Sequence, residues 1–216
     1  MTETTTEGRA WEYKGGVVVQ TTRPPIPNLS DVVTVVWHDS RARTPEQLRK
    51  AWALMGEIAA FQGQGKDDTY KEQQLAFSLK SLDMLNGELF HLSSATVSKC
   101  SAFISMLIEL IVENGIPTKD PLYDVCEDIT RYVYICTLNK VCAVCRRKAE
   151  LHHVDHVGAG FNRREICHIG MRCLPLCRGH HTEAHSIGET VFQEKYHLVP
   201  IEIDERIAKA YRLKTT

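Results

Sequence analysis

Residues 142–185 read CAVCRRKAELHHVDHVGAGFNRREICHIGMRCLPLCRGHHTEAH. This stretch holds seven of the ten histidines and five of the eight cysteines of the chain. Thiolates and imidazoles are the side chains that bind zinc and related metal ions. Their concentration in one segment therefore predicts metal binding, because histidines and cysteines of an ordinary core are scattered along a sequence.

Two pairs of residues in this stretch have the spacing of a zinc site. Cys142 and Cys145 are separated by two residues, so both thiolates of one tight turn can reach the same ion. Cys177 and His180 lie three apart at the predicted start of a helix and share one face of it. We predict that these four residues bind a structural zinc ion, because three sulfurs and one imidazole form a closed site.

Cys173 is the alternative to His180 as the fourth zinc ligand. It lies on a predicted strand, four residues before Cys177. If His180 is the ligand, we expect Cys173 and Cys167 to be small buried residues.

The remaining histidines predict a second, chemically different metal site. His181 and His185 are four residues apart, on a helix face rotated by roughly 100° from that of His180. His152 and His153 are neighbours at the end of a predicted strand, where successive side chains point to opposite faces. We therefore expect His152, His181 and His185 to hold a catalytic ion, and His153 to act as a base toward water.

The composition limits the class of protein. A chain of 216 residues with 43% apolar residues can form one substantial core, or a medium domain and a small one that needs a metal. The N-terminal sequence has no basic start followed by an apolar run, so we expect a reduced, cytoplasmic protein. Residues 104–112 form the longest apolar stretch, which is too short to cross a bilayer.

Charge is distributed unevenly along the chain. Residues 1–140 contain 14 Lys and Arg against 18 Asp and Glu, whereas residues 141–185 contain 7 against 4. A local excess of positive charge favours nucleic-acid binding, although a few solvated arginines would give the same count. The predicted DNA contacts are the arginines of this stretch: Arg146, Arg147, Arg163, Arg164, Arg172 and Arg178.

Patterns outside the metal-binding stretch predict a mainly helical N-terminal region with a short β-hairpin. Residues 1–10 are expected to be disordered, and residues 17–20 and 32–37 to be strands. Thr44 and Pro45 form a helix start, and Asn114-Gly115 a helix end. Further helices are expected at residues 69–79, from a Ser93-Ser94 cap to residue 114, from Asp120-Pro121 to residue 135, and at residues 190–196 and 204–211.

The cysteines and histidines together resemble the HNH, or ββα-metal, nuclease motif. That motif is matched by Cys142, Cys145, His152, His153, Leu176, Cys177, His180, His181 and His185. The resemblance implies a phosphodiesterase with His153 as general base. The family's asparagine before the second cysteine pair is replaced by Arg172, so Asn162 or His168 is expected to orient the base. Asp155 and His156 are the alternative acid-base pair.

A second resemblance covers the chain from about residue 31, which looks like HNH nucleases of phage recombination modules. Residues 43–55, RTPEQLRKAWALM, are similar to the start of the lambda Orf (NinB) recombination mediators. This similarity implies a homodimer that binds single-stranded DNA. The expected fold is α+β: a disordered tail at 1–10, an Orf-like domain at 11–140 and a zinc-stabilised HNH domain at 141–216.

The predicted function is a DNA endonuclease that uses Mg²⁺ or Mn²⁺ and acts on single-stranded or branched recombination intermediates. Its products would carry 5′-phosphate and 3′-hydroxyl ends, and a single-strand-binding protein of the host or a phage is an expected partner. If the protein is encoded by a phage, its expected location is the cytoplasm of the host cell. The alternative is a non-catalytic zinc-containing mediator that binds DNA. A third hypothesis, a protein-interaction adaptor, explains the cysteines but leaves the four further histidines without a role.

Overall fold

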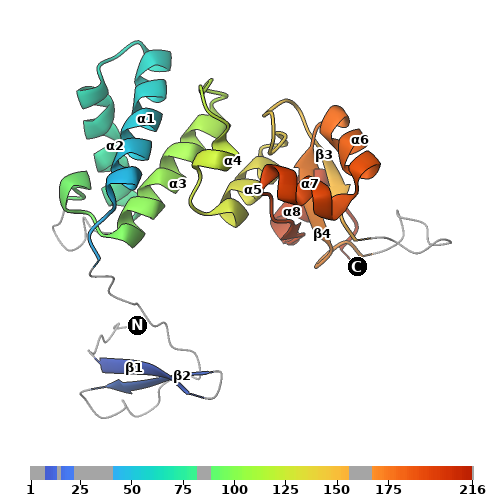
Figure 1. Ribbon diagram of the computed structural model, residues 1–216, viewed down its shortest axis with the longest axis horizontal. Helices are drawn as coiled ribbons and strands as arrows, with labels where there is room; N and C mark the ends of the chain where they lie inside the picture. Colours follow the sequence, from blue (N-terminus) through green and yellow to red (C-terminus); the bar gives the residue numbers. More distant parts are fainter. Residues whose placement is uncertain (1–7, 14–15, 22–40, 82–88, 156–166, 216) are drawn as a thin grey trace. The chain divides into compact units, whose positions relative to one another are not determined.

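The computed structural model describes residues 8–13, 16–21, 41–81, 89–155 and 167–215. The chain divides into two units, Met1–His38 and Asp39–Thr216. In the first unit, β1 (Gly8–Tyr13) and β2 (Gly16–Thr21) form an antiparallel hairpin, shown in blue in Figure 1. The short hairpin expected in this region is therefore present.

The hairpin differs from its prediction in its first strand. β2 contains the expected strand 17–20, but its partner is β1, which begins at Gly8. The last three residues of the tail expected to be disordered thus belong to a strand. The other predicted strand, at residues 32–37, lies outside the described residues.

The second unit begins with three packed helices, α1 (Pro45–Gln62), α2 (Lys66–Lys80) and α3 (Val97–Glu113). Thr44 and Gln47 form a capping box at the start of α1, as expected for a Thr-Pro pair at this position. α2 begins three residues earlier than predicted, with Asp67 and Asp68 in its first turn, where negative charge is favourable.

The structure differs from the prediction at the start of α3 (Val97–Glu113) and in the region that follows it. Ser93 and Ser94 belong to the 3-10 turn η2 (Leu92–Ser94), and Thr96 caps α3 instead, because its hydroxyl accepts from the amide of Lys99 at 3.2 Å. The helix expected from Asp120-Pro121 is divided into α4 (Leu122–Val125) and α5 (Ile129–Leu138). Asp128 caps α5 and so begins a new helix.

The C-terminal part combines a small sheet with three helices. The sheet is antiparallel with the order β3 (Glu150–His153), β4 (Arg172–Leu176) and β5 (Ile201–Glu202). α6 (Arg178–Ile187) follows β4 directly, and α7 (Glu189–Tyr196) and α8 (Glu205–Tyr211) follow in sequence, as Figure 1 shows in orange and red. The predicted α+β fold is confirmed.

The core of the second unit is continuous along α5. This helix contacts α3 as well as β4, β5 and α8. In the helical part, Phe103 is fully buried and its ring lies 5.4 Å from that of Phe77 and 4.9 Å from that of Phe90. Trp52 is half-buried and lies against Tyr70. No helix of the described residues is long and apolar enough to cross a membrane.

We predict that Phe103→Ala lowers the free energy of unfolding by about 3–5 kcal/mol, because it removes a fully buried aromatic ring and leaves a cavity. Leu75→Ala, on the 48% exposed Leu75 of α2, is the control and should cost under about 1 kcal/mol. Urea denaturation measures both values. Equal effects of the two substitutions would show that the aromatic cluster is not a major source of stability.

Candidate active site

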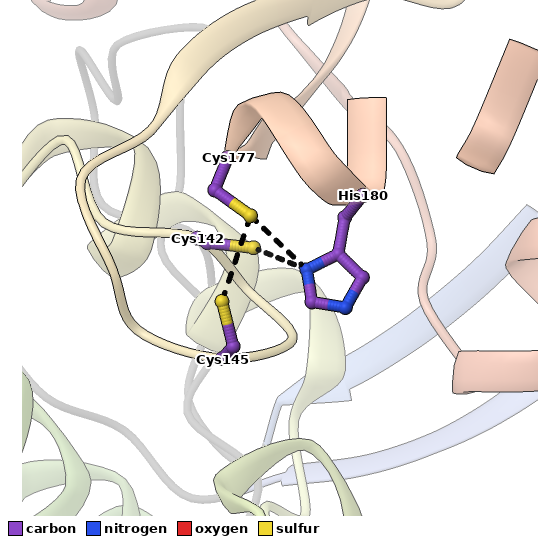
Figure 2. A group of neighbouring side chains, drawn as sticks. All are labelled: Cys142, Cys145, Cys177 and His180. Atoms are coloured by element: carbon purple, nitrogen blue, oxygen red, sulfur yellow. Dashed lines mark hydrogen bonds between the residues drawn. The ribbon is translucent and has the colours of Figure 1, made fainter. Parts of the chain in front are cut away.

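Four side chains converge on one point between the turn before β3 and the start of α6 (Figure 2). The Nδ1 atom of His180 lies 3.4 Å from the sulfur of Cys142 and 3.3 Å from that of Cys177. The sulfurs of Cys145 and Cys177 are 3.6 Å apart. Cys177 is the N-cap of α6, so His180 projects from the first turn beside it, as the sequence spacing predicted.

These distances fit a tetrahedral zinc ion. With bonds of about 2.3 Å to sulfur and about 2.0 Å to nitrogen, neighbouring ligand atoms lie about 3.5–3.8 Å apart. Cys173 is fully buried on β4 and is not part of the group, so His180 is the fourth member. Cys167, which we expected to be buried, is exposed, and its thiol donates to the carbonyl of Thr215 at 3.2 Å.

Arg147 provides positive charge beside the sulfurs. Its Nε lies 3.3 Å from the sulfur of Cys145, and an amino group lies 3.9 Å from that of Cys177. Burial is the largest single influence on the Cys145 thiol and raises its pKa, but hydrogen bonds from the side chain and backbone of Arg147 and from the two neighbouring cysteines together lower the net pKa. Burial raises the pKa of Cys142 to about 12. Arg147 thus favours the thiolate form that zinc binds, at the exposed side of the cluster.

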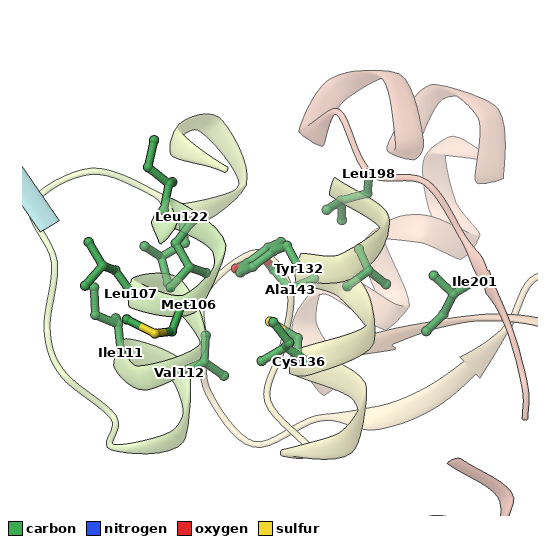
Figure 3. Packing of buried hydrophobic residues seen from close by; sticks show 14 of the residues in the cluster. Met106, Leu107, Ile111, Val112, Leu122, Tyr132, Cys136, Ala143, Leu198 and Ile201 are labelled. Carbon is green, nitrogen blue, oxygen red and sulfur yellow. The ribbon is translucent and has the colours of Figure 1, made fainter. Parts of the chain in front are cut away.

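The turn that contains Cys142 and Cys145 is supported by contacts with α5 and with the loop after α3. Ala143 packs beside Tyr132 of α5, whose hydroxyl donates to the carbonyl of Ala143 at 2.7 Å (Figure 3). Arg146, at a positive φ of 57°, donates to the carbonyl of Ile116 at 2.6 Å and to the hydroxyl of Thr118. Its guanidinium therefore ties the turn to the loop after α3, which competes with the DNA contact predicted for it.

The second cluster consists of three imidazoles, from His152 on β3 and from His181 and His185 on α6. Their ring centroids are 4.6–5.0 Å apart. Burial lowers the pKa of His152, and the two other imidazoles act in the same direction against the opposing charge of Glu189. A neutral imidazole is the form that binds a metal ion, so this cluster can hold a cation.

A different partner engages His153, the neighbour of His152 along β3. Its Nε2 lies 3.0 Å from the Nδ1 of His168, which is only 6% exposed. The main chain of His168 is tied to the C-terminal segment, since its amide donates to the carbonyl of Lys214 at 3.0 Å. The structure thus separates the two adjacent histidines, one into the imidazole cluster and the other into a hydrogen-bonded pair.

The other predicted site residues have different surroundings. Arg172 forms hydrogen bonds with both carboxylate oxygens of Asp155, at 2.6–2.9 Å, and these hold the pKa of that carboxyl below its usual range. Arg178 is exposed in the first turn of α6. The remaining candidates lie outside the described residues: Asn162, His156, Arg163 and Arg164.

Two acidic residues that the sequence analysis did not select lie at the imidazole cluster. A carboxylate oxygen of Glu189 on α7 is 2.7 Å from the Nε2 of His152. Glu150 on β3 is exposed and has an oxygen 3.8 Å from the Nδ1 of His181. Glu189 is four residues after His185, but Gly188 interrupts the helix between them, so helical spacing could not have indicated its position.

The sequence matches the family model described as "Putative HNHc nuclease" over residues 20–214. The chain belongs to this family. No curated protein and no solved structure matches the chain. The match confirms the HNH resemblance over most of the chain and places the chain in a nuclease family, while the similarity to the Orf mediators stays a prediction.

We predict that Cys177→Ser releases about one equivalent of zinc and strongly destabilises the second unit, because zinc binding contributes about 10 kcal/mol or more in small zinc domains. Cys173→Ala is the matched control, since Cys173 is an equally buried cysteine outside the group. Metal analysis and thermal denaturation measure the two effects. Zinc loss in the control rather than in Cys177→Ser would identify Cys173 as the ligand.

Proposed function

We propose that this protein is a DNA endonuclease dependent on a divalent metal ion, and that it acts on single-stranded or branched recombination intermediates. The main support for the proposal is that the adjacent His152 and His153 have different surroundings. One belongs to three clustered imidazoles that could hold a metal ion, and the other to a hydrogen-bonded imidazole pair that could supply a general base. A metal ion and a general base act together in metal-assisted phosphodiester hydrolysis.

In this proposal His153 is the general base. If its Nε2 donates to the Nδ1 of His168, the ring is held in the tautomer whose Nδ1 accepts a proton from water. The neutral His168 then stabilises the imidazolium that forms. In the alternative acid-base pair, Asp155 is less suited to accept a proton itself, because hydrogen bonds from Arg172 lower the pKa of its carboxyl.

The residues proposed to hold the divalent ion are His152, His181 and His185. Their fit to a cation is supported by the Nδ1 of His152, a buried atom with no hydrogen-bond partner in the part of the chain that the structure describes. When bound, the ion would polarise the scissile phosphate and stabilise the leaving 3′ oxygen. Imidazole suits transition-metal ions better than Mg²⁺, so Mn²⁺ is the better candidate of the two proposed ions. The products would carry 5′-phosphate and 3′-hydroxyl ends.

Basic residues near these groups are proposed to bind the DNA backbone. Arg178 is exposed at the start of α6, and Arg172 keeps 57% of its side chain exposed while it pairs with Asp155. A role in recombination, a homodimer and a single-strand-binding partner rest on the resemblance to the Orf mediators and stay predictions.

We expect His153→Ala to lower the cleavage rate by about 10²–10⁴-fold, because it removes proton transfer from the attacking water. Zinc content, melting temperature and DNA affinity should stay unchanged, since His153 is a member of neither metal cluster. Labelled linear, forked and four-way DNA substrates, with Mn²⁺ or Mg²⁺, measure the rate. The control is His197→Asn, which removes an exposed histidine at a left-handed position that asparagine tolerates.

The same assay separates the nuclease from the non-catalytic mediator. Binding of DNA by the wild type without cleavage, with every divalent ion tested, would favour the mediator. If His153→Ala is fully active and His156→Ala is inactive, the general-base role belongs to the Asp155-His156 pair.

His181→Ala should act through metal binding instead. It removes one of three imidazoles, so we expect half-maximal cleavage to require at least about tenfold more Mn²⁺, and the rate at saturation to fall as well. A metal titration of the cleavage rate distinguishes this behaviour from that of His153→Ala, whose metal dependence should not change. Identical metal dependence of wild type and His181→Ala would exclude His181 as a ligand.

A further inference from the structure

Glu189 reaches from the first turn of α7 to His152, the most deeply buried member of the imidazole cluster. Its Oε1 lies 2.7 Å from the Nε2 of His152, whose side chain is 1% exposed. The glutamate side chain itself is 20% exposed. The contact is therefore a charge-assisted hydrogen bond largely shielded from water, in which the imidazole N–H donates and the carboxylate accepts.

Two buried polar atoms of this pair have no hydrogen-bond partner among the described residues. They are the Nδ1 of His152 and the Oε2 of Glu189. A buried polar atom that lacks a hydrogen bond costs about 1–3 kcal/mol. A bound cation would account for the Nδ1 atom, because a ring nitrogen that carries no proton can donate its lone pair to a metal ion.

We propose that Glu189 is a positioning residue of the metal site and acts through His152. By accepting the Nε2 proton, the carboxylate selects the tautomer in which Nδ1 carries the lone pair for the ion, and it holds the ring in that orientation. It also brings one negative charge to a site whose three ligands are neutral imidazoles. Glu189 is not one of the clustered ligand atoms, so its effect passes through His152.

The chain geometry around Gly188 supports this role. Gly188 ends α6, which carries His181 and His185, and immediately precedes Glu189 in α7. Its backbone has φ 88° and ψ 149°, a conformation essentially restricted to glycine. This single residue therefore sets the direction of α7 after α6, and with it the approach of the carboxylate to His152 from outside the ligand cluster.

The inference rests on the proposed metal site, so its test measures metal binding apart from DNA cleavage. Full-length protein with its structural zinc loaded is titrated with Mn²⁺ by calorimetry, for the wild type, Glu189→Ala and Glu189→Gln. Glu194→Gln is the matched control, because Glu194 is an exposed glutamate of the same helix. Mn²⁺ is chosen because thiolate sites prefer zinc, so the structural zinc should remain in place.

We expect Glu189→Ala to weaken Mn²⁺ binding by about 10–100-fold, the usual effect of removing a residue that supports a ligating histidine. Glu189→Gln should lie between Glu189→Ala and the wild type, because its amide oxygen still accepts the N–H but carries no charge. A residue needed only for folding would give no such graded rescue. Zinc content and melting temperature check that each variant is folded.

The outcomes separate this inference from the proposed function. Wild-type affinity for Mn²⁺ in both Glu189 variants would overturn the role of Glu189 and leave the nuclease assignment intact. Graded loss of affinity in a protein that cleaves no DNA would support Glu189 and contradict the nuclease. Absence of a Mn²⁺ site in the wild type would overturn both the metal site and this inference.

Discussion

The arrangement of the candidate active site depends on one constraint. Four side chains meet at one point, those of Cys142, Cys145, Cys177 and His180. This group joins the turn before β3 to the first turn of α6, two segments more than thirty residues apart in sequence. Because Cys177 is also the N-cap of α6, the same group sets where that helix begins and how it is rotated. His181 and His185 then lie on the face that meets His152. A zinc ion here would both stabilise the fold and orient the helix that carries His181 and His185.

Because side chains alternate along β3, the adjacent His152 and His153 point to opposite faces of the sheet. His152 pairs in register with Leu174 of β4, and His153 with Cys173, so the two imidazoles leave the strand on opposite sides. One side meets α6 and Glu189, and the other meets His168. A strand of four residues thus presents the proposed metal ligand and the proposed base in fixed relation, which loops would hold less rigidly.

Residues outside the HNH motif contact both His152 and His153. Glu189 approaches His152 because Gly188 turns the chain between α6 and α7, and His168 approaches His153 while the C-terminal segment holds its main chain. Two arginines act beside the cysteine cluster. Arg147 donates to the sulfur of Cys145 and favours its thiolate form, and Arg146 anchors the turn to the loop after α3. Each of these contacts restricts the orientation of a residue in the candidate site.

The sequence by itself determined the features that depend on local geometry. The Cys-x-x-Cys turn, the Cys177 and His180 pair, the His181 and His185 spacing and the Thr44 cap all follow from distances within one turn of chain. Local patterns were insufficient where several hydroxyl side chains stand close together. We predicted the cap of α3 at Ser93-Ser94, but Thr96 caps this helix. Glu189 at His152, His168 at His153 and the pairing of Arg172 with Asp155 were decided by the tertiary structure. Each joins different elements of the chain, so its geometry exists only once sheet register and helix packing are set.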